Sequence, residues 1–294
     1  MRVISLGSGS SGNALFVEAG PQGRTRLLVD AGLGTRMIVQ RLQAIGVTPS
    51  QLAGILVTHE HSDHVQGIPP LMYHYATPVI ADQRTLDAVE EGIITRVWRT
   101  DTGRMAIANE ALFGDETHEF PQKSLFVPFP VGSQRLIGDI EVTSFATSHD
   151  AVAPCGYLLQ AGGCRVCFVT DTGTVTPETH KAIRHANLLI IESNYNRQQL
   201  LEGPYPRSVK RRIMSEVGHL SNAQAARAVH KSWSQKGTRW LWLAHLSRTN
   251  NTPELAIDDI RTHLQHVGVS LSQMTIAALP PGMGEVWDST GLWR

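Results

Sequence analysis

Four side chains that can bind metal ions lie within six consecutive positions, beginning at His59 and ending at His64. They belong to the heptapeptide Thr-His-Glu-His-Ser-Asp-His, which directly follows the apolar run 54–57. Imidazole and carboxylate groups without a thiolate suit zinc, manganese or iron. Residues two apart point to different faces of a helix, so a regular helix would scatter these groups, whereas a loop can bring them together. His59 and His61 can then face one ion, and the Asp63–His64 pair can face a second. The segment predicts a metal centre beyond the end of a buried strand.

Other candidate ligands follow predicted strands elsewhere in the chain. They are His149, Asp150, Asp171 and His245. Each of them alone could equally be a capping residue or a core residue. Together with the first cluster, they supply enough imidazole and carboxylate groups for two metal shells, with a carboxylate left to bridge the ions.

The elements that must position these side chains alternate short strands with helices. Apolar, β-forming runs predict strands at 3–6, 14–18, 26–29, 54–57, 140–145, 156–160, 165–169, 188–192, 239–244 and 274–278. Helical periodicity predicts helices at 35–45, 177–185, 208–217, 223–235 and 253–265. Two strand-rich halves that each carry helices predict two packed sheets with helices outside. The segment 95–138 has weak periodicity, and we interpret it as an insertion or lid.

The composition narrows the class of protein. The 294 residues are 41% hydrophobic and 18% charged, which is typical of a globular protein with a sizeable core. The 26 basic and 26 acidic side chains cancel, so any site for a polyanion must be local. Three cysteines are too few for a disulfide framework, and no apolar run approaches the length of a membrane span. We therefore expect a cytoplasmic protein without membrane contact, and no protein partner can be inferred.

Two short patterns suggest sites that their context does not support. The segment Gly7–Gly12 matches the G-x-G-x-x-G pattern of dinucleotide sites, which requires a helix directly after the third glycine. Here β-forming residues follow, so we interpret it as a structural Gly/Ser turn. An anion site lined by its backbone amides is the alternative. Cys164 and Cys167 form a CxxC pattern on a predicted strand, where they point to opposite faces and should pack in the core.

The pattern H-x-H-x-D-H, with a later histidine, an aspartate and a last histidine at strand ends, resembles the metallo-β-lactamase fold superfamily. Longer strings resemble its YycJ/WalJ (VicX) branch over nearly the whole chain. They lie at 5–13, 58–64, 148–157, 170–173, 191–196, 203–206, 218–222 and 244–256 and include SLGSGSSGN, THEHSDH, SHDAVAPCGY and AHLSRTNNTPELA. The segment 95–138 looks longer than in typical members.

The resemblance implies an α/β fold, the αββα sandwich of two mixed β-sheets flanked by helices, in a single domain over 1–294. It also implies two divalent metal ions, zinc or manganese, with iron possible. The implied ligands are His59, His61 and His149 for one ion, Asp63, His64 and His245 for the other, and Asp171 as a bridge. Asp30 would be a supporting carboxylate that orients the ligand loop.

The metal centre alone does not identify the substrate, because the superfamily also hydrolyses thioesters, lactams and lactones. Members of the YycJ/WalJ branch are regarded as 5′→3′ exonucleases or phosphodiesterases acting on DNA, so the resemblance makes DNA the expected substrate. Asp63 would orient the attacking water or accept its proton. His219 and Glu192 are similar in context to residues of the RNase J–type nucleases, where His219 would protonate the leaving oxygen or hold a phosphate. Alternatively, the His219 segment only precedes a helix capped by Ser221 or Asn222.

A basic cluster lies on the helix predicted at 208–217 and just before it. Its members are Arg207, Lys210, Arg211 and Arg212. It could follow a DNA backbone or be an ordinary solvated face. Two other functions stay open, namely a small-molecule hydrolase such as a cyclic phosphodiesterase or lactonase, and a metal-binding module without catalysis. A redox di-iron centre is a third.

Overall fold

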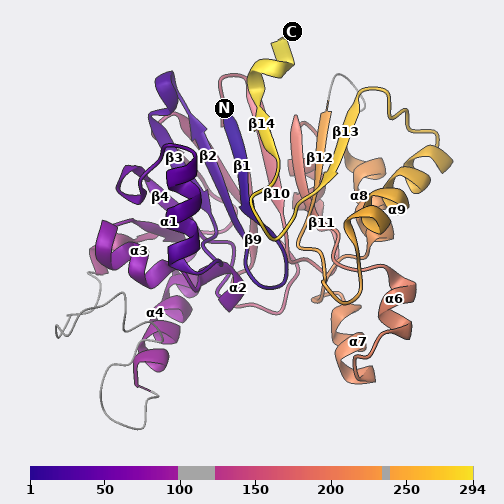
Figure 1. The fold of residues 1–294 in the computed structure, drawn as a ribbon, viewed down its shortest axis with the longest axis horizontal. Helices are drawn as coiled ribbons and strands as arrows, with labels where there is room; N and C mark the ends of the chain where they lie inside the picture. The colour runs from indigo at the N-terminus through magenta and orange to yellow at the C-terminus, as the bar shows by residue number, and fades with distance from the viewer. Residues whose placement is uncertain (99–122, 234–238, 294) are drawn as a thin grey trace.

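The computed structural model describes residues 1–98, 123–233 and 239–293, which form two facing seven-stranded sheets (Figure 1). The first sheet has the order β14-β1-β2-β3-β4-β5-β6 and the second β13-β12-β11-β10-β9-β8-β7. The strands of the first are β1 (Arg2–Gly7), β2 (Ala14–Ala19), β3 (Thr25–Val29), β4 (Gly54–Leu56), β5 (Val79–Ala81), β6 (Phe126–Pro128) and β14 (Val286–Asp288). Those of the second are β7 (Gln134–Ile137), β8 (Ile140–Ala146), β9 (Cys155–Ala161), β10 (Cys164–Val169), β11 (Leu188–Glu192), β12 (Arg239–Ala244) and β13 (Met274–Ala278).

Helices cover the outer face of each sheet. Over the first lie α1 (Thr35–Ala44) and α3 (Ile68–Tyr75), with α2 (Ser62–Val65) and α4 (Gln83–Trp98) near its lower edge in Figure 1. Over the second lie α5 (Pro177–Ile183), α8 (Asn222–Ser232) and α9 (Pro253–His266), while α6 (Arg197–Glu202) and α7 (Arg207–Ile213) project beyond its lower end. Short 3-10 turns lie at Pro21–Gly23, Pro49–Gln51, Lys123–Leu125 and Ser289–Trp293.

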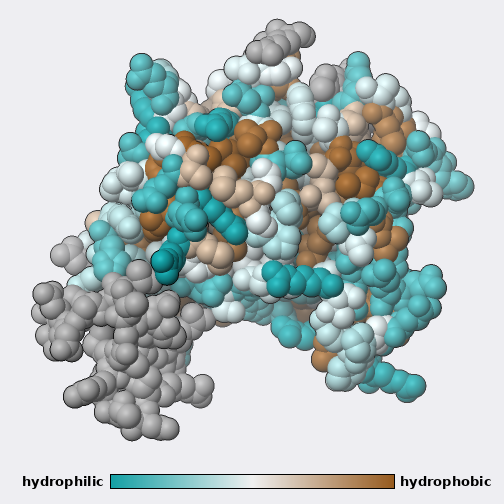
Figure 2. Space-filling view, viewed as in Figure 1, coloured by the Kyte–Doolittle hydropathy of each residue, from teal (hydrophilic) through white to brown (hydrophobic). Residues whose placement is uncertain are grey.

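The alternation of side chains along the strands produces the four layers. In β11, Leu188 and Ile190 enter the core between the sheets, whereas Leu189 and Ile191 enter the core under α5, α8 and α9. Strands buried on both faces need such uninterrupted apolar runs. In Figure 2 hydrophobic residues gather over the middle of the visible face, and hydrophilic residues predominate around α6 and α7. The αββα sandwich predicted from the sequence is therefore confirmed.

The cysteine pair follows the same alternation. Cys164 lies in the core between the sheets and Cys167 in the core on the helix side, and both thiols are free. Their packing role, predicted from the strand geometry, is confirmed.

Every strand predicted from the sequence is present, but several helices end earlier than predicted, among them α5 at Ile183. The helix predicted at 208–217 ends at Ile213, because the chain turns back there through bonds from the Gly218 amide to the Ser215 carbonyl and from the His219 amide to the Ile213 carbonyl. A side chain on residue 218 would lie 2.2 Å from the Arg212 carbonyl oxygen, so this turn requires glycine. The helix predicted at 223–235 ends at Ser232, because Trp233 has an extended backbone, and residues 234–235 lie outside the described residues.

The segment interpreted as an insertion or lid, 95–138, contains strands that the sequence pattern did not reveal. β6 pairs with β5, and β7 pairs with β8, so each is the edge strand of one sheet. The part from 99 to 122 lies outside the described residues.

Parallel pairing aligns the ends of neighbouring strands. In the first sheet β3 to β6 are parallel, and in the second β10 to β13 are parallel. Their carboxyl ends open at the same edge of the sandwich, where α/β folds place ligand sites.

Candidate metal centre

The predicted ligands meet at this edge. His59 and His61 lie in the loop after β4, Asp63 and His64 are in α2, and the others follow β8, β10 and β12. Donor atoms of His59, His61 and His149 lie within 4.8 Å of one another, and we call them the three-histidine group. Donor atoms of Asp63, His64 and His245 satisfy the same limit, and we call them the aspartate group.

Asp171 lies between the two groups. One of its carboxylate oxygens is 3.1 Å from His64 Nε2, and the other is 3.8 Å from His149 Nε2. A carboxylate in this place can bridge two cations, as the resemblance implies.

The arrangement of these donor atoms is better explained by binding of two divalent ions than by hydrogen bonds among the side chains themselves. His59 and Asp171 are 1% and 2% exposed, yet His59 Nε2 has no hydrogen-bond partner among the described residues, and Asp171 Oδ2 has only its ion contact with His64 Nε2. Buried polar atoms nearly always have such a partner. Buried atoms that converge with other imidazoles and carboxylates are therefore positioned to bind a cation, and these buried clusters suit a dinuclear site.

Hydrogen bonds on the far side of each imidazole orient the rings of the aspartate group. His64 Nδ1 donates to Asp30 (2.8 Å), and His245 Nδ1 donates to Glu192 (2.9 Å). Asp30 also accepts from the Thr58 amide at 2.9 Å, which ties it to the ligand loop as predicted for a supporting carboxylate.

Uncharged groups orient the three-histidine group. His59 Nδ1 donates to the Thr58 hydroxyl at 3.0 Å, and His149 Nδ1 donates to the Gly218 carbonyl at 3.0 Å. The turn that ends α7 early is thus the turn that supplies a partner for His149.

The pKa values of the histidines without metal follow this division. Burial lowers the pKa of His245, but the Asp171 charge and hydrogen bonds to Asp63 and Glu192 outweigh it and raise the pKa to about 10. The pKa of His64 is raised for the same reason, against burial, by Asp171 and Asp30. Burial leaves the pKa of His59 well below its ordinary value and lowers that of His149.

Three residues of the centre have a left-handed backbone. Asp30, Asp171 and His245 have φ values of 60°, 54° and 55°. The left-handed region is unfavourable for residues with a Cβ atom, and such residues gather at functional sites. Each lies just after a strand, so the turn directs the side chain across the open edge of the sandwich.

The Gly/Ser turn after β1 supports the aspartate group. Ser8 Oγ accepts from the His245 amide (2.9 Å) and donates to the side chain of Asn13 (3.1 Å). Asn13 Nδ2 lies 3.3 Å from His64 Nε2. A strand, β2, follows this turn in place of the helix that a dinucleotide site requires. Sequence reasoning did not anticipate that the turn packs on the candidate metal ligands.

His219 lies beside the ligands and is held by Glu192. Its Nδ1 donates to Glu192 Oε1 at 2.7 Å and is 3.6 Å from Asp171 Oδ1. The helix cap is supplied by Ser221, so His219 is not used for capping. Burial lowers the pKa of His219, but the charge and hydrogen bond of Glu192 outweigh it and raise the pKa above its ordinary value.

Glu192 supports its neighbours and is not available as a ligand, although it lies within 4.8 Å of Asp171, His219 and His245. Its Oε1 accepts from both histidines, and its Oε2 accepts from the amides of Thr172 (3.0 Å) and Leu220 (3.1 Å). All its acceptor positions are used by the protein.

Comparison with known proteins agrees with this geometry. A beta-lactamase superfamily domain model matches residues 25–237. The chain is 36% identical over 268 residues to exodeoxyribonuclease YycJ of Bacillus anthracis, covering 91% of this chain and 90% of that protein. It is 34% identical over 251 residues to exodeoxyribonuclease WalJ of Streptococcus pneumoniae, covering 85% and 83%. The chain belongs to the metallo-β-lactamase fold superfamily.

A solved structure of the superfamily shares the whole fold. The metallo-β-lactamase fold protein YhfI of Bacillus subtilis aligns with a TM-score of 0.64 over 98% of this chain and 99% of that chain, at 18% identity. With its His/Asp clusters, the present superfamily member is a metallohydrolase related to the YycJ/WalJ exodeoxyribonucleases. Within the described residues, no helix is both long and apolar enough to cross a bilayer.

The basic cluster on α7 divides into structural and exposed members. Lys210 Nζ donates to the Leu201 and Gly203 carbonyls, both at 2.7 Å, and so fixes the turn between α6 and α7. Arg212 forms an ion pair with the predicted candidate ligand Asp150 at 2.6 Å. Arg207 and Arg211 are exposed. Of the predicted substrate contacts, Lys210 is thus engaged by the protein itself.

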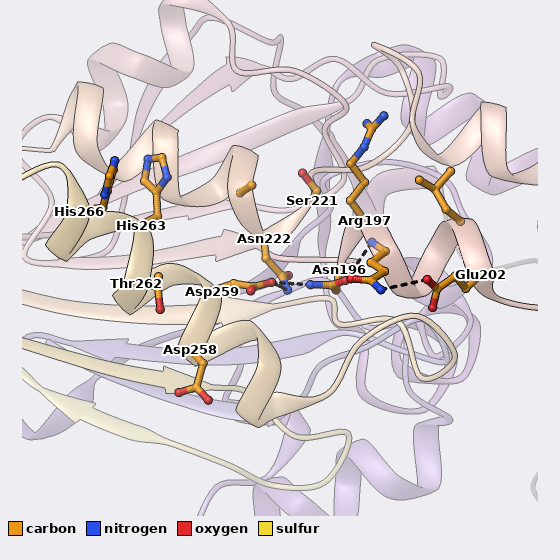
Figure 3. Close-up of a pocket in the computed structure, with 13 residues that line it drawn as sticks. Asn196, Arg197, Glu202, Ser221, Asn222, Asp258, Asp259, Thr262, His263 and His266 are labelled. Carbon is orange, nitrogen blue, oxygen red and sulfur yellow. Dashed lines mark hydrogen bonds between the residues drawn. The ribbon is translucent and has the colours of Figure 1, made fainter.

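A pocket of about 800 Å³ lies between α6, α8 and α9, away from the metal centre (Figure 3). Its floor is fixed by Asp259, which accepts from Asn196 and Asn222 at 2.8 Å each. None of the metal-binding groups lines it. This pocket is therefore separate from the metal centre.

Proposed function

We propose that this protein is a dinuclear metal-dependent phosphodiesterase that acts as a 5′→3′ DNA exonuclease. The observation that carries the proposal is the position of His219, which Glu192 holds beside the candidate bridging carboxylate Asp171. A histidine in this place suits a reaction whose leaving oxygen must receive a proton. The names of the relatives YycJ and WalJ support DNA as the substrate.

The candidate ligands would hold two divalent ions, which we propose to be zinc or manganese, with iron as an alternative. When bound, such ions would supply activated water and neutralise charge on a phosphate. The two nearby carboxylates differ in access, because the Asp63 side chain is 24% exposed and that of Asp171 only 2%. Burial raises the pKa of Asp63, but the hydrogen bond to His245 and the charge of His64 lower it below its ordinary value. Asp63 is therefore the ionised carboxylate positioned to orient water and accept its proton.

His219 completes the acid–base pair from the other side. Because Nδ1 is occupied by Glu192, Nε2 is the atom left to donate a proton to the leaving oxygen. Its side chain is 23% exposed, so substrate can reach it.

DNA would continue from the centre towards α7. This helix projects at the edge where the ligands lie (Figure 1), and Arg207 and Arg211 are exposed on it. Phosphate contacts need only such local charge, which a chain of balanced composition can still provide.

The test is digestion of end-labelled, 5′-phosphorylated DNA by protein loaded separately with Mn²⁺ and Zn²⁺, beside an Asp63→Ala control. We expect stepwise loss of nucleotides from the 5′ end by the wild type only. Failure to cut DNA with two ions bound per chain would contradict the proposal. Turnover of a cyclic phosphodiester or a lactone would then identify a small-molecule hydrolase, and no turnover at all would identify a metal-binding module.

A further inference from the structure

Arg248 joins two loops that come from different sheets and that each carry or contact residues of the aspartate group. It lies three residues after His245, in the loop that follows β12. Its Nη2 donates to Ser11 Oγ at 2.8 Å, and Ser11 is at the exposed tip of the Gly/Ser turn after β1. The base of that turn contacts the metal ligands through Ser8 and Asn13. The position of Arg248 is therefore tied to the metal centre from both sides.

The charge of Arg248 is not neutralised by the protein. In the described part of the chain no carboxylate lies within 4.0 Å of its guanidinium, whereas Arg212 near the three-histidine group is paired with Asp150. The side chains of Arg248, Ser10 and Ser11 are all exposed. An exposed guanidinium next to serine hydroxyls is a donor set for an oxyanion, and arginine binds phosphate through two parallel hydrogen bonds.

The same surface continues towards α7. Tyr205 Oη donates to Thr249 Oγ1 at 3.2 Å, which joins the residue after Arg248 to the loop that leads into α7. The loop that carries Arg248 therefore lies next to the segment that enters α7, where Arg207 and Arg211 are exposed. Exposed positive groups on neighbouring segments suit a chain of phosphates more than one small ligand.

We infer that Arg248, with the Ser10–Ser11 turn, binds a phosphate of the substrate next to the phosphate that is cleaved. This inference rests on the proposed phosphodiesterase function and adds the residue that recognises the neighbouring phosphate. Arg248 acts on the substrate without touching the reacting atoms, so it affects the binding of polymers and not the hydrolysis of a diester that has a single phosphate.

The test compares wild type, Arg248→Gln and Arg248→Lys, with Arg261→Gln on α9 as a matched exposed arginine away from the centre. Each protein carries its metals, with metal content measured. The substrates are bis(p-nitrophenyl) phosphate and matched oligonucleotides with a 5′-phosphate or a 5′-hydroxyl end. We expect Arg248→Gln to lose about tenfold or more in kcat/KM for oligonucleotides, mainly through KM, because a charged hydrogen-bond pair is removed. Its hydrolysis of bis(p-nitrophenyl) phosphate should stay within about twofold of wild type, and Arg248→Lys should recover part of the loss.

The two oligonucleotide ends locate the phosphate. If Arg248→Gln loses kcat/KM only for the 5′-phosphorylated oligonucleotide, Arg248 binds the terminal phosphate. If kcat/KM falls equally for both oligonucleotides, Arg248 binds an internal phosphate. The inference is overturned if Arg248→Gln cleaves oligonucleotides like wild type and Arg261→Gln, or if it loses both substrate classes equally.

A binding measurement separates this inference from the proposed function. Calorimetry follows a nucleoside 5′-monophosphate binding to the metal-loaded wild type and to Arg248→Gln. If the wild type cuts no nucleic acid, the exonuclease proposal fails. The phosphate subsite then stands if Arg248→Gln weakens this binding about tenfold, and it falls if the binding is unchanged.

Discussion

The two halves of the metal centre use similar ligands but different supports. In the three-histidine group the outer nitrogens of His59 and His149 bond to a hydroxyl and a backbone carbonyl. In the aspartate group those of His64 and His245 bond to carboxylates. A carboxylate partner makes an imidazole a more basic ligand and adds negative charge near the cation. The aspartate group should therefore hold its ion more tightly, and the three-histidine group should exchange its ion more readily.

The halves do not differ in burial. Each group has two buried ligands and one half-buried ligand, which is His61 in the three-histidine group and Asp63 in the aspartate group. Screening by solvent therefore does not distinguish the two ions. The asymmetry rests on the hydrogen-bond partners, and it can be tested one support at a time.

The largest expected effect comes from Asp63→Ala. The change removes a ligand of the aspartate group and the solvent-accessible carboxylate at once. We expect activity to fall by about 10³-fold or more, and metal content to fall from two ions to one per chain, measured by elemental analysis. Two retained ions with lost activity would restrict Asp63 to proton transfer and weaken the comparison.

His219→Gln should be next in size. Glutamine keeps a hydrogen-bond donor towards Glu192 but cannot supply a proton, so kcat should fall about 10²-fold or more with metal content unchanged. Because Glu192 keeps His219 protonated to a higher pH than an ordinary histidine, wild-type activity should decline as pH rises through that raised pKa. The variant should lack this alkaline decline. A pH profile identical to wild type would assign the titration to another group.

The sequence predicted which candidate ligands the structure brings together, because their residue types are those that bind metals. Four metal-binding groups within six residues after a strand are rarely found away from a metal centre, and the remaining ligands follow strands with clear apolar runs. The groups that orient the candidate ligands could not be predicted in this way. His149 is oriented by the backbone carbonyl of Gly218. Every residue has a backbone carbonyl, so no sequence pattern could identify this partner. The left-handed φ values of Asp30 and Asp171 arise from the tertiary fold and not from residue type.

The same reasoning accounts for two of the missed strands, β6 and β7, and for the grouping of Lys210 with the exposed arginines. β6 and β7 have three and four residues and lie at sheet edges, where exposed positions blur the alternation of side chains. Lys210 was grouped with its basic neighbours because charge is visible in the sequence, whereas its two carbonyl partners depend on how α6 meets α7.

Asp30→Asn isolates the support of one half. Asparagine keeps the size of the side chain and tolerates a left-handed backbone, so the fold should persist. It removes the negative charge behind His64, and we expect the affinity of the aspartate group for its ion to fall about 10–100-fold. Competition with a chromophoric chelator measures both ions in turn. In wild type the weaker ion should come from the three-histidine group, and in the variant the difference between the two ions should narrow or reverse. An equal loss at both sites would refute the asymmetry.

Thr58→Val should give the smallest effect and tests the asymmetry from the other half. The Thr58 hydroxyl accepts from His59 Nδ1 at 3.0 Å and donates to Asp30. In the variant, Asp30 keeps its hydrogen bonds from the Thr58 amide and from His64. Valine has nearly the same shape and removes only the hydroxyl. A neutral hydrogen bond contributes about 0.5–1.5 kcal/mol, so the affinity of the three-histidine group should fall about 2–10-fold. The aspartate group keeps its charged supports and should change less. If Thr58→Val instead weakened both ions as strongly as Asp30→Asn, the hydroxyl would be acting through Asp30, and the two halves would share one support.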